Sequence, residues 1–195
     1  MTTPLNRNYW ENRYQNNETG WDVGTITTPL KDYIDQLTDK SVRILLPGGG
    51  NGYELEYLLQ EGFTHSFVLD YASQPLKNIQ QRLPLIGDKH LIHGDFFEHS
   101  GKYDLIIEQT FFCALDPQLR NRYVDKMLDL LQQGGKLIGL LFQFPLDQSG
   151  PPFGGSQTEY ISRFSSAFEI KTLETAYNSI GPRKGNELFF IFIKK

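Results

Sequence analysis

The chain has 195 residues, a net charge of −4, 39% hydrophobic and 22% charged residues, and a single cysteine. These proportions are typical of one globular domain, and they exclude intrinsic disorder, a disulfide framework and a zinc site built from several cysteines. The acidic balance without a dense Lys/Arg cluster argues against nucleic-acid binding, and no apolar run approaches the roughly 20 residues of a membrane span.

The segment before the first strand-like run is rich in aromatic residues. It contains both tryptophans of the chain, Trp10 and Trp21, together with Tyr9 and Tyr14. Apolar spacing and the flanking residues predict two short helices in this segment, over residues 6–15 and 29–37.

Seven apolar runs predict strands along the rest of the chain, and most of them alternate with helical patterns. A loop at 145–155 contains three prolines and three glycines. Helices are predicted around Leu55–Leu59, over 73–82, from Pro117 to the pair Gly134-Gly135, and over 157–164. Strands are predicted at 42–46, 66–69, 91–92, 103–108, 136–142, 168–173 and 187–193.

This alternation of strands and helices with short connections predicts a parallel sheet covered by helices on both faces. The last two strands are linked by residues 178–185 without a helix, so we expect them to pair as an antiparallel hairpin at one edge. The predicted fold class is therefore α/β, a three-layer, doubly wound, mostly parallel seven-stranded sheet. Ligands of such folds bind at the carboxyl ends of the strands, near the point where the strand order reverses.

A glycine-rich loop, Pro47–Gly52, follows the first predicted strand and precedes a helix, as nucleotide-binding loops do. A Walker phosphate loop is excluded because no Gly-Lys-Ser/Thr follows. A dinucleotide loop fits poorly, since Tyr53 stands where that motif needs its third glycine. The alternating glycines Gly48, Gly50 and Gly52 instead let the backbone approach a bulky ligand.

Acidic residues end the second and third predicted strands. Asp70 follows the glycine loop by about 20 residues, where a carboxylate can accept hydrogen bonds from both hydroxyls of an unphosphorylated ribose. Asp95 can accept from an adenine amino group, and the ring of Phe96 can lie on the adenine. Taken alone, each residue also has a structural interpretation. Asp70 could cap the following helix, Asp95 could stabilise a turn, and Phe96 could belong to the hydrophobic core. Their order at successive strand ends favours a nucleoside-containing cofactor.

Together, the glycine loop, Asp70 and Asp95 resemble a class I S-adenosylmethionine-dependent methyltransferase, which has a Rossmann-like fold. The N-terminal segment narrows this resemblance to the thiopurine S-methyltransferase family, whose aromatic lid it is similar to. The residues that carry this similarity are Trp10, Arg13, Tyr14 and Trp21–Gly24. Later segments resemble the thiol and halide methyltransferase branch of that family, namely Thr110–Pro117 with Arg120 and Tyr123, and Gly150–Phe153 followed by Tyr160.

The resemblance implies S-adenosyl-L-methionine as the cofactor and one methyltransferase domain over residues 1–195, of which 1–40 form the lid. It implies that Asp70 holds the ribose and that Gly48 contacts the methionine part. The implied cofactor-binding residues are Trp10, Trp21, Gly48, Gly50, Asp70, Asp95, Phe96 and Gln109. Four residues depart from the family pattern and bear on the acceptor pocket: Tyr14, Gly49, Glu108 and Gln109.

Methyl transfer from a sulfonium is an in-line displacement, in which positioning the nucleophile supplies much of the acceleration. Halides need no base, and a thiol with a pKa near ~8.5 is partly ionised at neutral pH, so we assign no catalytic acid or base. The acceptor pocket should be apolar. Aromatic residues that fit such a pocket, each of which also fits ordinary core packing, are Tyr14, Trp21, Phe111, Phe112, Phe144, Phe153 and Tyr160.

Other chemistries lack support in the sequence. Cys113 lies in an apolar run without a paired histidine, so we interpret it as a packing residue. The spacing of His90 and His93 does not suit a metal site, and no Gly-x-Ser-x-Gly elbow of a serine hydrolase is present. We therefore assign no metal.

The sequence thus predicts a methyltransferase that acts on a small thiol, hydrosulfide or halide. Three alternatives stay open: a thiopurine, aromatic-thiol or chalcogen-detoxifying methyltransferase, a non-catalytic S-adenosylmethionine-binding module, and a dinucleotide oxidoreductase. We expect a cytoplasmic monomer, because neither a signal peptide nor an oligomerisation signal is apparent.

Overall fold

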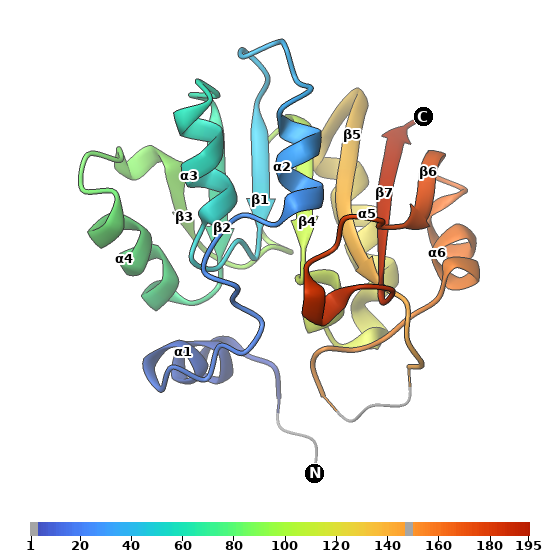
Figure 1. Ribbon diagram of the computed structural model, residues 1–195, viewed down its shortest axis with the longest axis horizontal. Coiled ribbons are helices and arrows are strands. Elements are labelled where there is room, and N and C mark those ends of the chain that lie inside the picture. Colours follow the sequence, from blue (N-terminus) through green and yellow to red (C-terminus); the bar gives the residue numbers. More distant parts are fainter. Residues whose placement is uncertain (1–3, 147–149) are drawn as a thin grey trace.

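The computed structural model describes residues 4–146 and 150–195 (Figure 1). Seven strands form one sheet in the order β3-β2-β1-β4-β5-β7-β6. The first five strands run parallel, whereas β7 is antiparallel to both β5 and β6. The strands are β1 Ile44–Pro47, β2 Ser66–Asp70, β3 Leu91–His93, β4 Tyr103–Gln109, β5 Leu131–Phe142, β6 Phe168–Thr175 and β7 Glu187–Lys194.

Helices cover both faces of the sheet, because successive side chains of each central strand point to opposite faces. In β1, Ile44 and Leu46 pack in the core under α2, α3 and α4, whereas Leu45 packs in the core under α5 and α6. Both cores are therefore built on the same strands. The helices are α1 Arg7–Gln15, α2 Thr28–Ile34, α3 Tyr53–Gln60, α4 Ser73–Arg82, α5 Arg120–Leu130 and α6 Gln157–Phe164, and the 3-10 turns are η1 Asp88–His90, η2 Phe112–Ala114, η3 Pro117–Leu119 and η4 Gly181–Arg183.

The strand order places the switch point between β1 and β4. From β1 the chain continues through α3 to β2 on one side, and from β3 it returns to β4 on the other side of β1. Connections that leave adjacent strands in opposite directions open a crevice at their carboxyl ends. Helix α1 belongs to neither helical layer and lies beyond this end of the sheet (Figure 1).

The predicted fold class is confirmed, including the antiparallel pairing of the last two strands. The long helix predicted from Pro117 to Gly134-Gly135 is wrong at both ends, since a 3-10 turn covers its start and α5 ends at Leu130. The glycines interrupt β5 instead: Gly134 has φ +73°, and the pairing of β4 with β5 jumps from Leu131 to Lys136. A left-handed glycine is as typical of a bulge as of a helix end, so the sequence alone does not separate them.

The loop predicted at 145–155 lies partly outside the described residues, which omit 147–149. Its two sides are joined by a bridge between Phe144 and Gly155. Among the described residues, no helix is long and apolar enough to cross a membrane.

Candidate functional site

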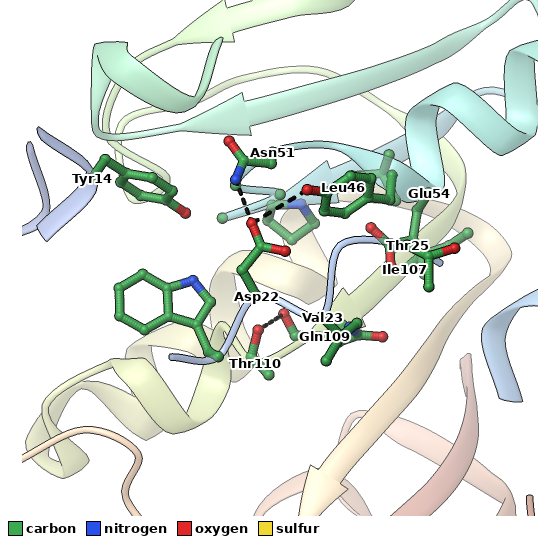
Figure 2. A pocket seen from close by; sticks show the side chains of 16 residues that line it. Tyr14, Asp22, Val23, Thr25, Leu46, Asn51, Glu54, Ile107, Gln109 and Thr110 are labelled. Carbon is green, nitrogen blue, oxygen red and sulfur yellow. Dashed lines mark hydrogen bonds between the residues drawn. The ribbon is translucent and has the colours of Figure 1, made fainter. Parts of the chain in front are cut away.

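A cavity of about 60 Å³ lies at the carboxyl ends of β1 and β4, where the switch point predicts a ligand site (Figure 2). The glycine loop and the start of α3 form one wall, and the end of β4 forms another. The segment between α1 and α2 covers it. The lining residues are Tyr14, Trp21, Asp22, Val23, Thr25, Leu46, Pro47, Gly48, Gly49, Gly50, Asn51, Tyr53, Glu54, Ile107, Gln109 and Thr110.

The glycine loop needs its glycines for conformation and for packing. Gly48 and Gly52 have φ +58° and +65°, a left-handed backbone that disfavours side chains. A Cβ atom on Gly48 would lie 2.3 Å from the ring of Phe111, and one on Gly52 would lie 2.6 Å from Ile79. The loop is therefore held close to both neighbours, and its backbone is left open toward the cavity.

Asp70 connects the end of β2 to this loop. Its side chain accepts hydrogen bonds from the backbone N–H of Gly50 and of Ala72, both at 2.9 Å. The residue is 7% exposed, and this burial raises the pKa of its carboxyl to about 6, although the two N–H donors favour the ionised form. A carboxylate oxygen keeps a free lone pair after accepting one bond, so Asp70 can also accept from a ligand hydroxyl.

Three aromatic rings cover the cavity from the N-terminal side. The ring of Trp21 is nearly perpendicular to that of Tyr14, with 5.8 Å between centroids, and to that of Trp10, with 5.6 Å. Tyr14 and Trp21 line the cavity, whereas Trp10 packs behind Trp21. Burial, with the nearby Asp70 charge, raises the pKa of Tyr14, so its hydroxyl stays protonated.

Polar contacts fix this N-terminal segment on the rest of the protein. The carboxylate of Glu11 accepts from the backbone N–H of Ser73, at 2.6 Å, and from its hydroxyl, at 3.1 Å. Ser73 is the first residue of α4, whose N-cap residue supplies no side-chain bond of its own. The α1 helix therefore caps α4, and negative charge at a helix N-terminus is favourable.

Two further contacts tie the segment to distant parts of the chain. Thr27 donates its hydroxyl hydrogen to Gln109 Oε1 at 2.7 Å, and Arg183 of η4 donates to the Trp21 carbonyl at 2.6 Å. The cover over the cavity is thus held from the end of β4 and from the turn before β7.

Glu108 is fully buried next to the cavity. Its carboxylate accepts from the backbone N–H of Phe111 and Phe112, at 2.9 and 3.0 Å, and from the Tyr123 hydroxyl at 2.6 Å. Burial raises the pKa of Glu108 to about 7. All of its contacts are internal, so Glu108 shapes the turn after β4, where Thr110 has φ +58°.

The residues predicted to meet adenine lie away from the cavity lining. The side chain of Asp95 accepts from the Phe97 N–H at 2.7 Å and so closes a turn. Phe96 is 5% exposed, and its ring packs edge-on against Phe111, 5.1 Å away. Phe111 in turn contacts Gly48, so Phe96 supports the glycine loop from behind.

Of the seven aromatic residues predicted for an acceptor pocket, only Tyr14 and Trp21 line this cavity. Phe112 and Tyr160 belong to the hydrophobic core, and the Tyr160 hydroxyl donates to the Phe142 carbonyl at 2.6 Å. The other three lie outside the cavity lining: Phe111 packs on Gly48, Phe144 pairs with Gly155, and the Phe153 N–H donates to the Cys113 carbonyl at 2.7 Å.

Two carboxylates of the cavity were missing from the predicted site. Asp22 accepts from the Gly24 N–H at 2.7 Å, from Tyr53 at 3.5 Å and from the side chain of Asn51 (Figure 2). Glu54 lies in the first turn of α3 and is only 9% exposed. An acid in a first helical turn is common, so only its position just after a glycine loop signals a site.

Nucleophilic and metal chemistry find no further support in the described part of the chain. Burial raises the pKa of the Cys113 thiol far above its ordinary value, which keeps the thiol un-ionised. Residues 4–146 and 150–195 contain no group of three or more His, Cys, Asp or Glu residues placed to hold a metal ion.

Comparison with known sequences identifies a family that matches most of the chain. The sequence model of the thiopurine S-methyltransferase family matches residues 5–189. A relative from Arabidopsis thaliana named probable thiol methyltransferase 2 is 31% identical over 184 residues, which cover 91% of this chain and 81% of the relative. A thiopurine S-methyltransferase from Acinetobacter baylyi is 26% identical and covers 93% of this chain and 94% of that protein.

Two solved structures of methyltransferases superpose well on this chain. The 1,6-didemethyltoxoflavin-N1-methyltransferase of Burkholderia thailandensis, solved with S-adenosylhomocysteine, superposes with a TM-score of 0.77 at 15% identity, over 97% of this chain and 87% of that one. A TehB-like methyltransferase of Corynebacterium glutamicum gives 0.70 at 17% identity, over 97% and 100% of the two chains. At these identities the likeness describes the fold.

Proposed function

The chain belongs to the thiopurine S-methyltransferase family of S-adenosylmethionine-dependent methyltransferases, and from this premise we propose that it methylates a small thiol, hydrosulfide or halide. The observation that carries the proposal is the position of Asp70. Its carboxylate is held against the glycine loop, at the end of β2, which pairs with β1. An acid at this place is suited to a ribose without a 2′-phosphate.

The residues around the cavity fit this cofactor in two further ways. The left-handed glycines expose backbone to a ligand, and two carboxylates face the cavity without a lining Lys, Arg or His. A cofactor with a sulfonium and an ammonium group suits such an acidic lining. When bound, this cofactor supplies an electrophilic methyl group.

The chain's own residues then have to bind, orient and exclude water. A halide or thiolate is already nucleophilic, so no proton has to be removed at the moment of transfer. Alignment of nucleophile and methyl group contributes much of the rate, up to about 7–11 kcal/mol for ideal intramolecular alignment. In this proposal Trp21 and Tyr14 keep water from the acceptor, and Gln109, held by Thr27, contacts the cofactor from the end of β4.

We also propose that residues 1–40, within one methyltransferase domain, act as a lid. The support lies in the part before α2. None of the residues of α1 is buried, α1 lies outside both helical layers (Figure 1), and polar contacts of Glu11 with Ser73 and of Arg183 with the Trp21 carbonyl hold this part in place. Leu30 and Ile34 of α2 belong to the core, so α2 is the fixed end of the lid. A segment held by a few polar contacts can open at moderate cost, as an entry path for the cofactor requires.

The choice of a small acceptor rests on the relatives and on the segment after β4. The relatives include a probable thiol methyltransferase at 31% identity and a thiocyanate methyltransferase of Brassica oleracea at 27%. The turn after β4 is filled by Phe111 and Phe112 and closed by Glu108. Other relatives are named thiopurine S-methyltransferase, so an aromatic thiol is the second candidate acceptor.

The experiment compares kcat/KM for hydrosulfide, iodide, an aromatic thiol and a thiopurine at saturating S-adenosylmethionine, with S-adenosylhomocysteine as the measured product. Turnover confined to the small anions supports the proposal. Turnover of the two ring compounds with higher kcat/KM would assign the protein to the thiopurine side. Cofactor binding without turnover of any acceptor would support the non-catalytic binding module.

A further inference from the structure

The carboxylate of Glu54 faces the cavity and has no partner outside its own residue in the described part of the chain. It is 9% exposed, and neither a hydrogen bond nor an ion pair joins it to another described side chain. A buried carboxylate without a cation or donor is costly, and proteins retain few of them without a function. Asp22, in the segment that covers the cavity, also lines it, so the lining contains two acidic side chains (Figure 2).

The position of the two acids limits what they bind. Glu54 lies in the first turn of α3, and Asp22 is bonded to Asn51 in the loop between β1 and α3, whereas Asp70, the proposed ribose ligand, lies at the end of β2. A ligand whose ribose rests on Asp70 therefore extends its other substituent toward β1 and β4. Two carboxylates repel a thiolate or halide and attract a cation, so this end of the cavity is unsuited to the acceptor.

We propose that Glu54, assisted by Asp22, binds the α-ammonium group at the amino-acid end of the cofactor. This inference rests on the proposed function. Asp22 is already oriented by Asn51 and the Gly24 N–H, which leaves Glu54 as the free acceptor. An ammonium group has three donors and satisfies the carboxylate that the protein leaves without a partner.

The charged groups around Glu54 support this assignment. Burial raises the pKa of its carboxyl to about 7, Asp22 adds to the rise, and Arg183 opposes it. Tyr53 is the other titratable neighbour, and its pKa is also raised. A bound cation stabilises the ionised carboxylate, so the cofactor should bind with release of a proton near pH 7. Affinity should be constant above about pH 7 and decrease as the pH falls below it.

Three ligands separate the ammonium contact from the rest of the cofactor in calorimetric binding experiments. S-adenosylhomocysteine carries the ammonium and the carboxylate, its decarboxylated form carries the ammonium alone, and 5′-methylthioadenosine carries neither. The variant is Glu54→Gln, which keeps shape and removes charge. The matched control is Glu61→Gln, an exposed acid at the other end of α3.

We expect Glu54→Gln to weaken binding of the two ammonium ligands about 10- to 100-fold and to leave 5′-methylthioadenosine unchanged. Proton release near pH 7 should disappear in this variant, and Glu61→Gln should bind all three ligands as the wild type does. Equal weakening of all three ligands, or of none, would overturn the inference. If the wild-type protein binds none of them, the proposed function itself is wrong.

Discussion

At the scale of single residues, the proposed ribose ligand Asp70 gives a direct test of cofactor binding. Substitution Asp70→Asn removes the charge from the proposed bonds to the ribose hydroxyls while it keeps one acceptor for the backbone N–H groups of Gly50 and Ala72. Loss of charge-assisted hydrogen bonds worth about 1.5–3 kcal/mol should raise the Kd for S-adenosylhomocysteine about 10- to 100-fold. Isothermal titration calorimetry measures this change.

The control for this prediction is Asp88→Asn, an exposed aspartate in η1 outside the cavity lining. Its Kd should equal that of the wild type. An Asp70→Asn protein that is folded and binds the cofactor with unchanged affinity would remove Asp70 from the site.

Gly48 offers a test of the loop at the same scale. Alanine at this position adds left-handed strain and places Cβ 2.3 Å from the Phe111 ring. We expect Gly48→Ala to lower the free energy of unfolding by about 2–5 kcal/mol, from about 1–2 for the conformation and 1–3 for overpacking. Denaturant unfolding measures it.

Gly62→Ala is the matched control, because Gly62 also has positive φ, at +87°, but no atom lies within 4 Å of its added Cβ. Gly62→Ala should lower the free energy of unfolding only by the part that comes from the left-handed conformation. Equal losses in the two variants would show that the Phe111 contact contributes nothing.

Site residues at the ends of strands were predictable from the sequence. Those that are buried only by the segment between α1 and α2 were not. Gly48, Gly50 and Gln109 line the cavity, and Asp70 contacts the loop, because chain order alone places them at the ends of parallel strands. Glu54 was missed, since a glutamate in a first helical turn is ordinary until the cover buries it.

Among the elements, the carboxylate of Glu11 in α1 forms hydrogen bonds with the first residue of α4. Substitution Glu11→Ala removes the acceptor of the Ser73 N–H and hydroxyl and leaves the first turn of α4 without a cap. A lost cap costs about 1 kcal/mol. We therefore expect faster amide hydrogen exchange in residues 7–15 and in the first turn of α4, with the sheet unaffected.

Glu18→Ala is the control for this element. Glu18 lies in the same segment and its only described partner is Arg13, with which it forms an exposed ion pair at 3.3 Å that contributes little. Exchange in α1 should stay at the wild-type rate. A Glu11→Ala protein whose α1 exchanges no faster would contradict docking through this carboxylate.

The elements themselves were predictable where an apolar run or helical spacing is long, as for β4, β5 and α6. The first and last residues of the elements were less predictable. The helix before β5 was extended to Gly134-Gly135, yet it ends at Leu130, because pairing of Leu131 with Tyr103 starts the strand before the glycine bulge. Such pairing is a long-range contact that local spacing does not encode.

For the whole molecule, buried carboxyls make the stability without ligand depend on pH. Burial raises the pKa of Asp70 to about 6 and those of Glu54 and Glu108 to about 7, above the ~4 of an unfolded chain, and it also raises the pKa of the buried Glu187. Between these values the folded state binds more protons than the unfolded state, so the free energy of unfolding falls as pH rises. Calorimetry should show Tm decreasing from pH 5 to 7.5.

Carboxyls with lowered pKa values, among them Asp35 and Asp39, lose their stabilising effect only in more acidic solution, below this window. Glu108→Gln should flatten the decrease, since it removes one of these titrating groups. A Tm that rises from pH 5 to 7.5 would mean that these carboxyls are ionised in the folded protein throughout.

In our proposal the cavity between β1 and β4 serves methyl transfer from S-adenosylmethionine to a small acceptor. It is tested by measuring formation of S-adenosylhomocysteine by the purified protein with and without hydrosulfide, beside the Asp70→Asn variant. We expect product formation that requires hydrosulfide and is strongly reduced in the variant at sub-saturating cofactor. Product formation that is independent of hydrosulfide, or equal in both proteins, would contradict it.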